Sequence, residues 1–180
     1  GLTLPSNISP LNGLVCVDFL LNYQGLITVC SGTWVVGEVE DRVKMLVDKT
    51  RLALWEAIYK VRPGKRIGDL EWAMQQITEQ NNLGNVTVLG GHGVGRAIHD
   101  EPMILSTGSP GKGPKIFENM VFTIEPMFTL GSGEVVFDRS KEDGWTVRTQ
   151  DKSWSAHEEH TVLVTKKGCE VLTEVKEGWL

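Results

Sequence analysis

The chain has 180 residues, of which 41% are hydrophobic and 23% are charged, as is usual for a globular protein. This length predicts a single domain over residues 1–180, or two halves that share one core. The formal net charge is −5 and no block is rich in Lys and Arg, which argues against nucleic acid as a partner. No apolar run approaches the ~18 residues of a transmembrane helix, so no membrane partner is expected. Three scattered cysteines argue against a disulfide framework and favour a reducing, cytoplasmic compartment.

The first predicted element is a β-hairpin. Residues 14–21 form an apolar strand, residues 22–25 a turn and residues 26–36 a return strand. With the turn centred between Tyr23 and Gln24, Asp18 lies directly opposite Val29, with the two side chains roughly 5 Å apart on one face.

Two helices follow in the pattern of apolar residues. The spacing of three and four residues predicts helices over residues 37–61 and 67–81, and Pro63-Gly64 separates them. Further strands are expected at residues 86–89, 119–125, 134–137, 145–149 and 160–164. Two helices followed by several strands indicate an α+β fold with a mixed or antiparallel curved sheet.

Asp18 is the first candidate functional residue. It interrupts an apolar strand, where a buried carboxylate is costly unless it is paired or bound to a metal ion. The alternative is an aspartate on an edge strand that faces water.

Two histidines, His92 and His99, lie in or beside the glycine-rich stretch 90–96. Each can be a loop histidine bonded to the backbone, but their closeness favours a site. Histidine serves there as a metal ligand or as a proton-transfer group.

Two further carboxylates come from strand ends. Glu125 ends an apolar strand and precedes Pro126; alternatively, it reaches solvent. Glu158 and Glu159 point to opposite faces of a strand, so one of them joins an inward site and the other lies at the surface.

These candidates together predict a metal site. Asp18, His92, Glu125 and Glu159 provide three carboxylates and one imidazole beside strands of one sheet. Carboxylates that gather in a core require a cation, and an oxygen-rich set with one histidine suits Mn, Fe or Co at least as well as Zn.

Four ordered motifs resemble those of type I methionine aminopeptidases. They are G-H-G-V-G-R…H-D-E-P, F-T-I-E-P-M, D-G-W-T-V-R-T and A-H-E-E-H-T-V-L-V-T, and the similarity runs from Gly13 to Thr173. The resemblance implies the pita-bread fold of creatinases and aminopeptidases, largely its C-terminal half. It also implies a cytoplasmic hydrolase that acts in protein maturation.

The resemblance assigns roles to individual residues. It makes Asp18, His92, Glu125 and Glu159 ligands of one or two divalent ions (Co, Mn, Fe or Zn), with Glu125 or a bridging carboxylate as the proton acceptor. It implies that His99 contacts the scissile peptide group of an N-terminal peptide substrate and that Trp145 lies near the rim of the active site. It implies that His160 contacts the metal ligands and not the metal ion.

Two departures from the family pattern leave alternatives open. Val29 stands where the family has a metal-bridging aspartate, and the family's N-terminal half is largely absent, so the domain is expected to be N-terminally incomplete. The resemblance therefore implies removal of N-terminal methionine by a metal-activated water, with full or impaired activity. The alternatives are an inactive pita-bread module that binds peptide or protein, and a proline-directed or creatinase-like relative. A half pita-bread exposes apolar sheet surface, which predicts self-association or a covering partner chain.

Overall fold

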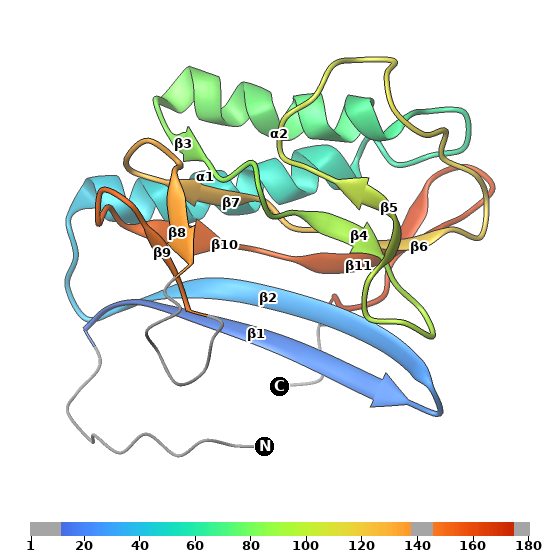
Figure 1. Ribbon diagram of the computed structural model, residues 1–180, viewed down its shortest axis with the longest axis horizontal. Coiled ribbons are helices and arrows are strands. Elements are labelled where there is room, and N and C mark those ends of the chain that lie inside the picture. Colours follow the sequence, from blue (N-terminus) through green and yellow to red (C-terminus); the bar gives the residue numbers. More distant parts are fainter. Residues whose placement is uncertain (1–11, 138–145, 175–180) are drawn as a thin grey trace.

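The computed structural model describes residues 12–137 and 146–174. Its helices are α1 (Asp41–Ile58) and α2 (Ile67–Asn81). Its strands are β1 (Gly13–Tyr23), β2 (Leu26–Val36), β3 (Gly84–Asn85), β4 (Gly91–Gly93), β5 (Asp100–Ile104), β6 (Val121–Ile124), β7 (Met127–Thr129), β8 (Val135–Phe137), β9 (Val147–Thr149), β10 (Ser155–His157), β11 (His160–Val164) and β12 (Cys169–Val171). The two helices cover one side of the central strands, and the curved β1–β2 hairpin runs along the other side (Figure 1).

The hairpin turns one residue later than its sequence predicts. Gln24 and Gly25 have φ values of 52° and 79°, and positive φ at both central residues is the requirement of the tight hairpin turn that matches strand twist. Asp18 therefore pairs with Ser31, and Val29 pairs with Leu20. The predicted opposition of Asp18 and Val29 is wrong. The error is a shift of two residues in the pairing, which preserves the faces, so Val29 remains a diagonal neighbour of Asp18 on the same face.

The helices supply half of the buried core residues. The predicted helix over 67–81 is confirmed, and the carboxylate of Asp69 caps its first turn by accepting the N–H of Arg66 at 3.0 Å. The predicted helix over 37–61 is shorter, from Asp41 to Ile58. Both helices bury one apolar face against the strands, as their spacing predicts. No helix in the described part of the chain is long and apolar enough to cross a membrane.

The central strands form a five-stranded sheet in the order β12-β11-β6-β4-β5, beside a smaller sheet β10-β7-β3. Every pairing among the described strands is antiparallel, so the α+β prediction with an antiparallel sheet is confirmed. The strand predicted at 86–89 is wrong, because pairing ends at Asn85. Strands β4, β5, β7, β10 and β12, of three to five residues each, were not predicted from the sequence.

One edge of the hairpin is attached to the end of β10 and the start of β11. Ser31 and Glu159 exchange backbone hydrogen bonds of 3.2 and 2.9 Å. The Thr33 hydroxyl donates to the carbonyl of His157 at 2.7 Å and accepts its N–H at 2.9 Å. This attachment continues the face that carries Asp18 across β2 to the strand ends that carry the other candidate residues.

Candidate metal centre

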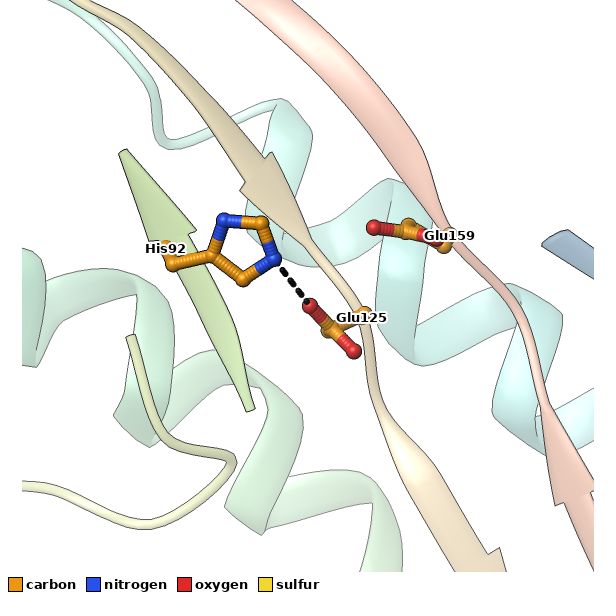
Figure 2. Close-up of side chains that lie close together, drawn as sticks. All are labelled: His92, Glu125 and Glu159. Carbon is orange, nitrogen blue, oxygen red and sulfur yellow. Dashed lines mark ion pairs between the residues drawn. The ribbon is translucent and has the colours of Figure 1, made fainter. Parts of the chain in front are cut away.

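Three predicted ligands converge in the structure. His92, Glu125 and Glu159 each offer one donor atom, and these atoms all lie within 4.8 Å of one another. Figure 2 shows the three side chains reaching toward a common point from neighbouring strands. The register explains this convergence. Ile124 pairs with His160, so Glu125 and Glu159 lie side by side just beyond that pair.

The imidazole of His92 is held in the orientation that a metal ligand needs. Its Nδ1 lies 3.0 Å from the carbonyl oxygen of Gly93, which fixes the proton on Nδ1 and leaves the lone pair on Nε2. Nε2 lies 3.6 Å from Oε1 of Glu125. The Thr123 hydroxyl donates to the same Oε1 at 3.1 Å and accepts the backbone N–H of His92 at 3.1 Å. One threonine therefore positions both side chains.

The carboxylate of Glu159 is buried, with 2% of the residue exposed. Burial and the neighbouring charge of Glu125 raise its pKa to about 8. A buried carboxylate beside a second one is unfavourable unless a proton or a cation neutralises the charge. The donor set therefore fits a divalent cation, which would be the largest local charge at this position.

The site opens into a cavity of about 680 Å³ whose walls include Asp18, His92, His99 and Glu125. The ring centroids of His92 and His99 are 4.4 Å apart, so His99 lies beside the proposed metal ligands, and its contact with the scissile peptide group stays a prediction. The apolar part of the wall consists of Val88, Leu89, Met103 and Met127. A donor cluster at one end of an apolar cavity is the usual form of a site that positions a small ligand.

His157 also lines this cavity and was not predicted from the sequence. Its Nε2 lies 3.5 Å from Oε2 of Glu125. Burial lowers the pKa of His157, but the neighbouring Cys16 and Glu125 side chains outweigh that effect and raise the pKa to about 10. The alternation of side chains along a strand could have found it, because His157 precedes Glu159 by two residues and so shares its face.

The structure places Glu158 differently from the prediction. One of the glutamates was expected at the surface, but Glu158 is only 5% exposed. Its Oε1 accepts a hydrogen bond from the guanidinium of Arg51 at 3.0 Å and the backbone N–H of Thr33 at 3.3 Å. The surface prediction is wrong because Arg51 of α1 compensates the buried charge.

His160 and Trp145 have different outcomes. The ring of His160 packs against Trp55 with centroids 5.5 Å apart, and its Nδ1 lies 2.9 Å from the hydroxyl of Thr173. These contacts lie away from the proposed ligands, and a supporting role for His160 stays a prediction. Trp145 lies outside the described residues.

Val29, where the sequence resemblance implies a missing carboxylate, is 8% exposed. The Thr161 hydroxyl accepts its N–H at 3.0 Å and donates to its carbonyl at 2.7 Å. The backbone is thus fixed on the inner face, with an apolar side chain where the family pattern has a ligand.

The chain is similar to known metallopeptidases. Residues 5–166 match metallopeptidase family M24. The methionine aminopeptidase of Rickettsia prowazekii is 42% identical over 169 residues, which are 93% of this chain and 64% of that protein. That of Aquifex aeolicus is 37% identical over 177 residues, 97% of this chain and 67% of that protein. The chain therefore spans about two thirds of the length of these relatives.

Solved structures give the same result. The methionine aminopeptidase of Thermotoga maritima is 42% identical and superposes with a TM-score of 0.87, covering 91% of this chain and 65% of that chain. A prolidase from Pyrococcus furiosus, 23% identical, shares the fold with a TM-score of 0.70 over 92% of this chain and 43% of its own. The predicted pita-bread fold and the resemblance to methionine aminopeptidases are confirmed, and the chain belongs to metallopeptidase family M24.

Proposed function

We propose that this chain is a metal-dependent aminopeptidase that removes N-terminal methionine from proteins. The observation that carries the proposal is the cluster of His92, Glu125 and Glu159 at one end of a partly apolar cavity. Relatives of 37–42% identity that are named methionine aminopeptidases support it.

The geometry supports the proposed ligand roles. His92 Nε2 and the carboxylates of Glu125 and Glu159 would hold a divalent cation, and Asp18 adds a carboxylate on the cavity wall. This donor set suits Mn, Fe, Co or Zn. A bound cation of this kind lowers the pKa of a water molecule and polarises a peptide carbonyl.

The proton transfers belong to the protein side chains. Glu125 is one of these ligands, and its carboxylate is fixed by the Thr123 hydroxyl. With a single cation bound, its second oxygen accepts the proton of the attacking water. His99, in contact with the His92 ring, faces the cavity and is positioned to hydrogen-bond the peptide group under attack. These two residues are the proposed catalytic residues.

The substrate is an N-terminal peptide. The acidic wall formed by Asp18, Asp100 and Glu101 attracts an α-ammonium group. The apolar wall formed by Val88, Leu89, Met103 and Met127 accepts an unbranched thioether side chain. Trp145 at the rim, a cytoplasmic location and a single domain over residues 1–180 stay predictions.

Turnover of methionyl peptides tests the proposal. Purified chain supplied with Co²⁺, Mn²⁺ or Fe²⁺ is expected to release methionine from a Met-Gly-Met peptide, and His92→Ala is expected to lower the rate at least ~100-fold. An X-Pro peptide is the matched control, because its cleavage in preference to the methionyl peptide would indicate a proline-directed enzyme instead.

The inactive alternative gives a different result. A chain that binds no metal and releases no methionine contradicts the proposal. If Val29→Asp then restored both properties, the chain would be a pita-bread module that kept the fold and lost the chemistry.

A further inference from the structure

We propose that His157 is a metal ligand, and that a second divalent cation binds between Nε2 of His157 and Oε2 of Glu125. Glu125 then bridges two cations, one on each carboxylate oxygen. The inference rests on the proposed metal centre and extends it to a residue that the sequence motifs do not mark as a ligand.

The distances around Glu125 are nearly symmetrical. Oε1 lies 3.6 Å from Nε2 of His92, and Oε2 lies 3.5 Å from Nε2 of His157. Two donors that bind one tetrahedral cation at about 2.1 Å are about 3.4 Å apart. The His92–Glu125 pair and the His157–Glu125 pair therefore each have the spacing of two ligands on one shared ion. The Glu125 carboxylate offers one oxygen to each pair.

The ring nitrogen of His157 is an unused donor. Nε2 is buried, and it has no hydrogen-bond partner of good geometry within residues 12–137 and 146–174. A buried polar atom without a partner is unfavourable and calls for a ligand. The Thr33 hydroxyl bonds both the carbonyl and the N–H of His157. These bonds hold the strand segment that carries the imidazole in place.

The strand register fixes the positions of His157 and Val29 relative to Glu159. Across β2, Thr161 lies beside Val29, Glu159 beside Ser31 and His157 beside Thr33. Val29 and His157 therefore flank the row of Glu159 on opposite sides. On the side of Val29 the chain lacks a carboxylate, and on the side of His157 it carries an imidazole. The remaining coordination positions face the cavity that Asp18 also lines.

Metal stoichiometry in matched variants tests this arrangement. The full chain, freed of metal by chelation, is equilibrated with Co²⁺ and the bound metal is measured by mass spectrometry. The wild type is expected to bind two ions, and His157→Gln is expected to bind one, with the lost ion at least ~100-fold weaker. His92→Gln is the reciprocal control, which loses the other ion, and Glu125→Gln weakens both. Circular dichroism checks that each variant is folded.

A second readout needs no substitution. Two Mn²⁺ ions bridged by one carboxylate couple magnetically, so the electron paramagnetic resonance spectrum of the wild type with Mn²⁺ is expected to show a coupled pair. A wild type that binds one ion, dependent on His92, overturns the second site and leaves the proposed function standing. Equal stoichiometry in the wild type and folded His157→Gln overturns it as well. Absence of any bound ion refutes both proposals.

Discussion

Val29 is a residue at which the sequence departs from the family that it resembles, because the family pattern has an aspartate there. The Thr161 hydroxyl bonds both the N–H and the carbonyl of Val29. A substitution therefore changes the side chain and leaves these backbone hydrogen bonds in place. We expect Val29→Asp to destabilise the metal-free protein by about 1–3 kcal/mol, because a carboxylate replaces a buried methyl pair.

Added metal should reverse the effect of Val29→Asp. The new carboxylate lies diagonal to Asp18, so the increase in Tm on adding Co²⁺ is expected to be larger in the variant than in the wild type. Val29→Asn is the control for side-chain size without charge. Differential scanning fluorimetry with and without metal measures both effects, and an equal metal response in all three proteins would contradict this reasoning.

Protonation of the metal-free site predicts a pH dependence of stability. The pKa of Glu159 is raised from 4.5 to about 8 and that of His157 from 6.5 to about 10. Both groups bind protons more tightly in the folded chain than in the unfolded chain. Their contributions to stability are therefore full below the unfolded pKa values and are lost as pH rises through the folded ones.

The Tm of the metal-free protein is expected to fall between about pH 6 and about pH 9, and Glu159→Gln should flatten the part of this curve below about pH 8. Thermal melts in a chelating buffer measure it. An identical slope in wild type and variant would show that other groups control the curve.

Single residues differ in how much of their role the sequence reveals. Glu125 and Glu159 were expected in one cluster and lie together. Asp18 was expected to be a buried carboxylate, but it is exposed and lies outside that cluster, although it lines the cavity. His157 was missed because an imidazole beside two glutamates does not have the cost of a buried carboxylate, and its significance depends on its distance from Glu125. The burial of Glu158 was missed because Arg51, which compensates it, is remote in sequence.

At the scale of elements, the ion pair between Arg51 and Glu158 attaches α1 to the strand ends that carry the site. The Glu158 side chain is 7% exposed and that of Arg51 is 44% exposed. Arg51→Met removes the guanidinium and leaves the buried Glu158 carboxylate without its ion-pair partner. The substitution is expected to lower the free energy of unfolding by about 1–3 kcal/mol.

The exposed pair of Lys44 and Asp41 in the same helix provides the control for Arg51→Met. Lys44→Met should change stability by at most about 0.5 kcal/mol, because solvent screens such pairs. Urea denaturation followed by circular dichroism compares the two variants. Equal losses in the free energy of unfolding would mean that the Arg51–Glu158 contact contributes no more than the exposed pair.

Elements were predictable where a period was long enough to be seen. The helix over 67–81 has several turns of apolar spacing and a capping Asp69, and its bounds are confirmed. The hairpin strands were found, but their register was not, because it depends on which two residues take positive φ. The three-residue β4 lies within the glycine-rich loop, where only its partners β5 and β6 define it as a strand.

Over the whole molecule, the outer face of the hairpin is strongly apolar. Val17, Phe19, Leu21 and Tyr23 alternate along β1, and each is at least half exposed, from 50% to 68%. A contiguous apolar surface of this kind favours association. We expect the purified chain to self-associate with increasing concentration in sedimentation velocity.

Phe19→Lys is expected to weaken that self-association at least ~10-fold. Tyr59→Lys, at an exposed aromatic residue on the helical side, is the control and should have little effect. A wild type that sediments as a monomer at all accessible concentrations would refute the prediction.

The attachment of β2 to the strand ends near residue 159 also has a consequence for the order of events during synthesis. The clasp of Val29 by Thr161 joins residues 132 positions apart, and Asp18, His92, Glu125 and Glu159 come from four separate stretches of the chain. The hairpin can form locally within microseconds, but it carries only one of the four donors. A growing chain therefore has no metal centre to fill until β11 has left the ribosome and docked, and the metal ion then binds the completed fold in preference to its unfolded precursors.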